Sequence, residues 1–162
     1  GTIGLEIFAE MPDLENVLVP TGGGGLLAGV ALAIKSLNNN VKVYGVEPEL
    51  AADATESYKK GRRILWPAEK TTATMADGVR TQQVGELNFE IIQKHVDGFF
   101  TATESEILEA AKYYLHKAKI MLEPTGALSL AAYLANKSQI KGKTVLIISG
   151  GNFSPEFLEQ LF

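Results

Sequence analysis

The sequence predicts an α/β fold of three layers, in which a mostly parallel sheet carries helices on both faces. Short apolar runs alternate with helical patterns along the chain, an order typical of βα units. The clearest of these runs are apolar at every position, as expected for parallel strands buried on both faces. Two glycine-bearing turns directly follow such runs. The 162 residues, 46% hydrophobic and 21% charged, suit one domain with a sizeable core.

The first half of the chain predicts two strands and three helices. An amphipathic stretch over residues 2–9 indicates the tail of a helix, and Pro12 cannot continue it. Pro48 is expected to end the second strand, and Gly61 suits the left-handed position that stops a helix. The other expected elements are a strand over 16–20, a helix over 25–38, a turn at 38–40, a strand over 41–47 and a helix over 51–60.

The second half predicts two more strands. Residues 62–83 show no periodic pattern and are expected to be irregular. Thr103 and Glu106 form a capping box, and Pro124 suits the first turn of a helix. The elements expected here are helices over 88–95, 103–119 and 124–136, strands over 98–102 and 144–149, and a short terminal helix after Ser154.

The composition excludes several classes of protein. The chain has no cysteine, which rules out disulfides and thiolate metal sites and fits a reducing compartment. The net charge is −4 and the basic residues are scattered, whereas a nucleic-acid-binding protein needs a basic patch. No apolar run approaches the roughly 20 residues of a membrane span, and no secretory signal is present. We therefore expect a cytoplasmic protein with neither a nucleic-acid nor a membrane partner.

Four consecutive glycines, Gly22, Gly23, Gly24 and Gly25, lie where the first strand gives way to an apolar helix that starts near Leu26. So many glycines cost conformational entropy, but they present bare N–H groups at the positive end of a helix. This arrangement can seat a phosphate group. A tight turn that only allows close helix–strand packing is the simplest alternative, although one or two glycines would suffice for it.

Two phosphate-bearing ligands fit this loop. The first is a dinucleotide, because Gly23 to Ala28 matches the G-x-G-x-x-G/A pattern and Glu47 ends the next strand, where a ribose-binding carboxylate is expected. The second is a monophosphate cofactor such as pyridoxal phosphate (PLP), which would use all four glycines. It would also give a role to the turn from Ser149 to Asn152, provided that the two strands are neighbours in the sheet.

The chain resembles the threonine dehydratase and serine racemase family of fold-type II PLP enzymes. The resemblance extends over nearly the whole chain and implies the tryptophan synthase β-like fold, of which this would be the large-domain portion. Six motifs in the order of the family carry it: Gly1-Thr2-Ile3-Gly4-Leu5-Glu6, Pro20-Thr21-Gly22-Gly23-Gly24-Gly25-Leu26, Gly45-Val46-Glu47-Pro48, Ala76-Asp77-Gly78-Val79, Glu123-Pro124-Thr125-Gly126-Ala127 and Ser149-Gly150-Gly151-Asn152.

The resemblance implies roles for individual residues. Gly22 to Gly25 and Leu26 would hold the cofactor phosphate through their N–H groups. Ser149 would face the pyridine nitrogen, where a neutral hydroxyl leaves that nitrogen largely unprotonated and favours elimination of a β-substituent. Gly78 would bring its backbone near the ring, and Glu123 would lie behind it.

The resemblance also implies a cation site made of Glu47, the carbonyl of Ala51 and Asp53. A set of oxygen ligands suits a hard cation such as Mg²⁺ or Ca²⁺. The alternative is a strand-end carboxylate and an ordinary aspartate at a helix N-terminus. Since Glu47 is also the ribose partner of the dinucleotide interpretation, its role separates the two hypotheses.

The family's Schiff-base lysine and small domain have no counterpart in this chain, and Gly1 is not an initiator Met, so we expect a piece of a longer enzyme that is inactive alone. The expected activity of the whole is that of an L-threonine (L-serine) dehydratase in amino-acid metabolism, forming 2-oxobutanoate (pyruvate) and ammonia as a homo-oligomer. Serine racemase, a dinucleotide-binding domain of an oxidoreductase and a non-catalytic domain are the alternatives.

Overall fold

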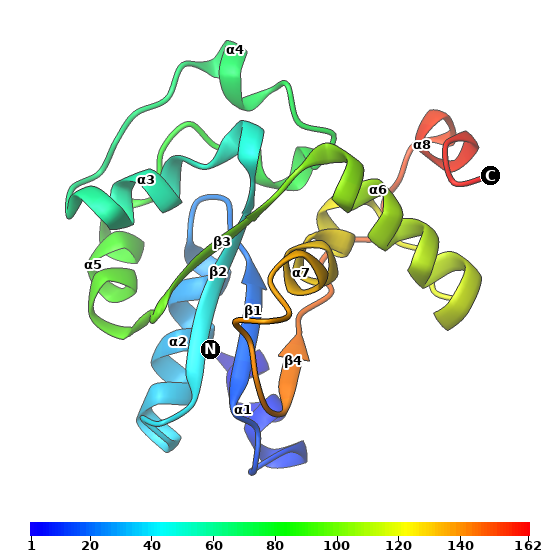
Figure 1. Cartoon of the computed structure of the whole chain (residues 1–162). Coiled ribbons are helices and arrows are strands. Elements are labelled where there is room, and N and C mark those ends of the chain that lie inside the picture. Colours follow the sequence, from blue (N-terminus) through cyan, green and yellow to red (C-terminus); the bar gives the residue numbers. More distant parts are fainter.

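Four parallel strands form a single sheet in the order β3-β2-β1-β4 (Figure 1). The computed structural model describes residues 1–162. Parallel neighbours cannot be joined by a tight hairpin, so every connection crosses over through at least one helix. The strands are β1 (Asn16–Pro20), β2 (Lys42–Pro48), β3 (Gly98–Ala102) and β4 (Thr144–Leu146).

Helices cover both faces of the sheet, as the sequence predicts. In Figure 1, α2 and α5 lie on one side of the strands and α6 and α7 on the other. Helix α1 packs on α2, and α3 lies against β2, β3 and α5. The α-helices are α1 (Thr2–Glu10), α2 (Gly25–Leu37), α3 (Asp53–Lys60), α4 (Ala68–Thr71), α5 (Glu86–His95), α6 (Glu104–Tyr113), α7 (Pro124–Ala135) and α8 (Pro155–Glu159). Three short helical turns complete the chain: η1 (Glu49–Ala51), η2 (Asp77–Val79) and η3 (Tyr114–Ala118).

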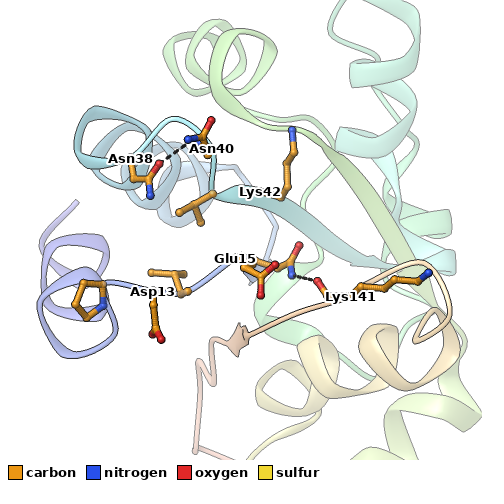
Figure 2. A pocket seen from close by; sticks show the side chains of 10 residues that line it. Asp13, Glu15, Asn38, Asn40, Lys42 and Lys141 are labelled. Atoms are coloured by element: carbon orange, nitrogen blue, oxygen red, sulfur yellow. Dashed lines mark hydrogen bonds between the residues drawn. The ribbon is translucent and has the colours of Figure 1, made fainter.

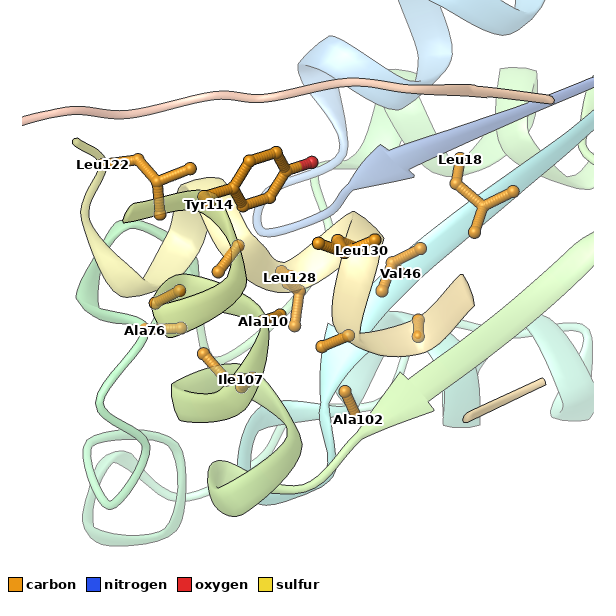
Figure 3. Packing of buried hydrophobic residues seen from close by; sticks show 14 of the residues in the cluster. Leu18, Val46, Ala76, Ala102, Ile107, Ala110, Tyr114, Leu122, Leu128 and Leu130 are labelled. Atoms are coloured by element: carbon orange, nitrogen blue, oxygen red, sulfur yellow. The ribbon is translucent and has the colours of Figure 1, made fainter. Parts of the chain in front are cut away.

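The sheet separates two hydrophobic cores. Val17 and Val19 of β1 face one core together with α2, whereas Leu18 between them faces the other core. This alternation leaves β1 buried at every position. Figure 3 shows the second core, in which Leu18 and Val46 of the sheet belong to the same cluster as Leu128 and Leu130 of α7. Burial on both faces explains why the strands are continuous apolar runs in the sequence.

Several predicted boundaries are wrong. The last strand ends at Leu146 instead of residue 149 because the neighbouring Pro20 has no N–H with which to extend the ladder beyond Ile147. Pro48 belongs to β2 as its last residue, where its missing N–H interrupts no further ladder. The long helix predicted up to residue 119 is α-helical only to Tyr113 and continues as the π-helical turn η3.

Two predicted helix ends with a clear local signal are confirmed, and one predicted helix start is wrong. Thr103 and Glu106 form the expected capping box at the start of α6. Gly61 takes the left-handed conformation that ends α3, with φ of 64°. The helix predicted from residue 51 instead begins as η1 and becomes α-helical at Asp53. All the strands run towards the edge of the sheet near α3 and α4, and the candidate site lies at that edge (Figure 1).

Candidate cofactor site

The carboxyl ends of β1 and β4 open into a cavity of about 220 Å³. These strands are parallel neighbours, so the two turns that follow them lie side by side. We call them the glycine loop (Gly22–Gly25) and the serine turn (Ser149–Asn152). The cavity is lined by Pro20, Gly22, Gly23, Gly24, Gly25, Leu26, Gly78, Val79, Thr125 and Ser149, and no lysine or arginine is among them.

The glycine loop presents a row of free main-chain donors. No protein acceptor receives a hydrogen bond from any N–H group of Gly22 to Leu26. The loop leads directly into α2, whose first residue is Gly25 and whose positive dipole end faces the cavity. An anion bound here would be neutralised by backbone amides and the helix dipole rather than by a basic side chain.

Gly24 shows why the loop requires glycine. Its φ of 85° lies in the left-handed region, which side chains other than glycine disfavour. A Cβ atom at this position would lie 2.8 Å from Val84 and 2.9 Å from Ile92. The loop therefore approaches the core more closely than any residue with a side chain allows.

Two residues outside the predicted set fix the loop from behind. The carbonyl oxygen of Gly23 accepts hydrogen bonds from the Asn88 side-chain amide at 2.7 Å and from the Gly85 N–H at 3.0 Å. Holding this carbonyl on the far side keeps the loop's N–H groups directed towards the cavity. Sequence reasoning missed Asn88, since an asparagine in a helix 65 residues away from Gly23 gives no local signal.

Gly78 reaches the cavity from the turn η2. Its N–H donates to the hydroxyl of Thr125 at 3.1 Å, which ties η2 to the start of α7. A Cβ atom on Gly78 would lie 2.9 Å from that hydroxyl and 3.2 Å from Glu123 Oε1. The bare backbone of Gly78 thus forms a flat wall of the cavity. Thr125 belongs to a motif seen in the sequence, but its contact with Gly78 was not predicted.

Glu123 lies behind this wall and holds the serine turn. Its Oε2 accepts the Asn152 N–H at 2.8 Å, and its own N–H donates to the Gly150 carbonyl at 3.4 Å. The turn carries the half-buried Ser149 to the cavity. Glu123 itself does not line the cavity, so it can act only through the residues it positions.

Glu47 is turned away from this cavity. It has no exposed surface, and its carboxylate accepts hydrogen bonds from the N–H groups of Ala54 at 3.0 Å and Thr55 at 2.6 Å. The Thr55 hydroxyl donates a third bond at 2.5 Å. A carboxylate enclosed in this way at the start of α3 cannot reach a ribose, so the dinucleotide interpretation loses the residue on which it depends.

Asp53 lies beside Glu47 and is equally buried. Three donors face its carboxylate, namely the N–H groups of Asp53 and Val84 and the hydroxyl of Thr81, but none of them meets hydrogen-bond geometry. Burial raises the pKa of Glu47 to about 8 and that of Asp53 to about 7. No three side chains of the His, Cys, Asp and Glu types gather closely enough to hold a metal, so a cation here would also need main-chain oxygen.

A larger cavity of about 460 Å³ lies at the opposite, amino-terminal edge of the sheet (Figure 2). Two of its charged side chains already have partners: Asp13 pairs with Lys143, and Lys42 pairs with Asp97 at 3.0 Å. Ligands of open parallel sheets bind at the carboxyl ends of the strands, so this cavity is not the expected cofactor site.

No helix of the chain is long and apolar enough to cross a membrane.

A parallel α/β sheet with a row of free main-chain amides at its carboxyl edge is typical of proteins that bind a phosphorylated ligand. The family profile described as "Pyridoxal-phosphate dependent enzyme" matches residues 1–151, and the chain belongs to this family. It is 43% identical over 164 residues to an L-threonine ammonia-lyase of Thermotoga maritima, a match that covers 99% of this chain and 39% of that protein. It is also 43% identical to a serine racemase of Schizosaccharomyces pombe, covering 99% of this chain and 50% of that protein.

Solved structures agree with this assignment. The fold superposes on the crystal structure of a threonine deaminase with a TM-score of 0.91 and 44% identity, covering 95% of this chain and 53% of that chain. The maize serine racemase gives a TM-score of 0.90 at 33% identity, covering 98% of this chain and 49% of that chain. The family and fold expected from the motifs are therefore confirmed, and the dinucleotide alternative is not favoured. The chain spans between 39% and 53% of the length of these relatives.

Proposed function

We propose that this chain is the large-domain portion of a PLP-dependent ammonia-lyase that converts L-threonine to 2-oxobutanoate and ammonia, and L-serine to pyruvate and ammonia. The observation that carries the proposal is the row of free N–H groups from Gly22 to Leu26, opposite Ser149 in one cavity. The lysine that binds the cofactor and the small domain would come from sequence beyond this chain.

The residues present fit PLP. The glycine loop would bind the phosphate through its N–H groups, and the α2 dipole would compensate its charge. Gly78 would bring its backbone near the pyridine ring, and it must be glycine because a side chain there would meet Thr125 and Glu123. When bound, PLP withdraws electrons from a linked amino acid, which makes its α-proton acidic and its β-hydroxyl able to leave.

Ser149 would set the strength of this electron withdrawal. Its hydroxyl would hydrogen-bond the pyridine nitrogen as a neutral partner, so that nitrogen would stay largely unprotonated. A carboxylate at this position would instead favour protonation. Glu123 would hold the serine turn so that the hydroxyl keeps its direction. Moderate electron withdrawal by the cofactor suits loss of a β-hydroxyl. The departing hydroxyl carries away the negative charge that loss of the α-proton leaves on the substrate, so that charge needs to be stabilised only briefly.

The test uses the complete polypeptide encoded by the gene. We expect the purified protein to show the visible absorption band of lysine-bound PLP, to lose that band on borohydride treatment, and to release ammonia and 2-oxobutanoate from L-threonine. Formation of D-serine from L-serine without ammonia would identify the racemase alternative. Tight NAD binding with no visible band would contradict the proposal.

We also propose that Glu47, the Ala51 carbonyl and Asp53 bind a divalent cation such as Mg²⁺ or Ca²⁺. Two buried carboxylates side by side, one of them without any hydrogen bond, need compensation. The Ala51 carbonyl accepts no main-chain hydrogen bond and remains available. Oxygen-only ligands of this kind match the preference of hard cations.

The cation site predicts a distinctive pH dependence of stability. Because burial raises both pKa values, to about 8 and about 7, the folded cation-free protein holds protons that the unfolded chain has already released. Stability should therefore fall as pH rises from about 5 to 8, by roughly 1.4 kcal/mol per pH unit for each group still protonated. Mg²⁺ should raise the melting temperature far more at pH 8 than at pH 5.5.

The matched control is the double variant Glu47→Gln, Asp53→Asn, which keeps the shape of both side chains. We expect it to lose both the pH slope and the response to Mg²⁺ in thermal unfolding. An equal Mg²⁺ effect at the two pH values, or an unchanged effect in the double variant, would refute the cation site.

We further propose that the whole enzyme is a cytoplasmic homo-oligomer, either a dimer or a tetramer. Light scattering of the purified protein can determine the number of subunits.

A further inference from the structure

Three buried polar atoms near the candidate cation site lack partners. Two are the carboxylate oxygens of Asp53, and the third is the hydroxyl oxygen of Thr81. A buried polar atom without a hydrogen bond is costly, so such groups normally have a protein, water or ion partner. Three of them in one region indicate that something binds between them.

Thr81 lies between the candidate cation site and the glycine loop. Its side chain neighbours Asp53 and stabilises the charged form of that carboxyl, although the two groups do not complete a hydrogen bond. Its methyl group faces the other way. A Cβ atom built on Gly22 would lie 3.4 Å from Thr81 Cγ2, and one built on Gly23 would lie 4.0 Å from it. The same short side chain therefore lies close to both places, about one methyl group away from the backbone of the glycine loop.

The number of ligands available supports a role for this hydroxyl. Hard cations take about six or more oxygens, whereas Glu47, Ala51 and Asp53 supply few. The Glu47 oxygens already accept three hydrogen bonds from Ala54 and Thr55. A neutral hydroxyl facing Asp53 is a further oxygen that a cation, either directly or through one bound water, can use.

We propose that Thr81 is a further member of the cation site, binding the ion through its hydroxyl, and that its methyl group couples the ion to the glycine loop. This inference rests on the proposed cation site. The bound ion fixes the Thr81 side chain, and the fixed methyl group supports Gly22 and Gly23. Cation binding and phosphate binding should then strengthen each other by the same factor.

The two functions of Thr81 can be separated by two substitutions in the complete polypeptide. Thr81→Val keeps the shape but removes the hydroxyl, and we expect it to weaken Mg²⁺ binding at least tenfold. Thr81→Ser keeps the hydroxyl but removes the methyl group. Its affinity for Mg²⁺ should stay within about threefold of that of the original protein. The factor by which Mg²⁺ increases PLP affinity should fall towards one. Titration calorimetry with Mg²⁺, with and without PLP, measures the Mg²⁺ affinity of each variant and this coupling factor.

The outcomes distinguish the inference from the proposal beneath it. If Asp53→Asn abolishes Mg²⁺ binding but Thr81→Val leaves it unchanged, the cation site stands and the role of Thr81 is refuted. If Mg²⁺ does not bind the original protein, both fail, and an ordered water accounts for the buried groups. Thr81→Ala, which adds no bulk, must weaken Mg²⁺ binding as Thr81→Val does; otherwise the valine effect is steric and the inference is overturned.

Discussion

Replacing Gly24 by alanine should destabilise the protein by roughly 2–5 kcal/mol and weaken PLP binding by more than tenfold. Alanine at a φ of 85° costs about 1–2 kcal/mol. Its methyl group would also overlap Val84 and Ile92, and overpacking of this kind costs about 1–3 kcal/mol. Relief of the overlap must move the loop, which turns its N–H groups away from the phosphate. Urea unfolding of the cofactor-free protein and a PLP titration measure the two effects.

Gly25→Ala is the matched control for stability. It lies next to Gly24 in the same loop, has an ordinary φ, and would place its methyl group 3.8 Å from the nearest atom, Asn88 Nδ2. We expect its unfolding midpoint to equal or exceed that of the original protein, because alanine lowers the entropy of the unfolded chain. Equal destabilisation by both substitutions would mean that the conformation of Gly24 is not the constraint.

Replacing Ser149 by alanine should lower kcat for L-threonine by about 100-fold or more, the range found when one preorganised hydrogen-bonding group is removed from an active site. PLP affinity should change much less, since on the proposed function the glycine loop would provide most of the phosphate contacts. The alanine is smaller and lies in a half-buried position, so folding should be unaffected. Steady-state kinetics and the PLP absorption spectrum of the complete enzyme test this expectation.

Two further substitutions control the Ser149 experiment. Ser149→Thr keeps a hydroxyl at the same position and should retain most of the activity. Ser149→Asp introduces a carboxylate that favours protonation of the pyridine nitrogen, so the absorption band should shift and the ratio of elimination to racemisation should fall. Full activity in Ser149→Ala would show that this hydroxyl does not tune the cofactor.

Much of the fold is readable from local patterns. The strand from Asn16 to Pro20 is apolar at nearly every position and is buried at every position. The capping box at Thr103 and the left-handed Gly61 lie where their residue types predict. The misplaced end of the last strand is set by a neighbouring strand. That strand stops at Leu146 because Pro20, more than a hundred residues earlier, cannot donate to it.

The candidate site also combines features that local sequence predicts with features that only contacts between distant segments reveal. The sequence predicts the glycine loop as a phosphate seat because four adjacent glycines before a helix are a local feature. The anchoring of Gly23 by Asn88 and the contact of Gly78 with Thr125 join distant segments and leave no trace in any short window. The unpartnered hydroxyl of Thr81 likewise becomes visible only when burial is known.

The sequence by itself determined the α/β class, the family and the two turns that we propose hold the cofactor, because each depends on residues adjacent in the chain. Only the tertiary structure decided that the turns meet, since this requires β1 and β4 to be neighbours. It also decided that Glu47 faces α3 rather than the cavity, because hydrogen bonds from Ala54 and Thr55 hold it there. Contacts between distant segments form through packing, which local pattern does not encode.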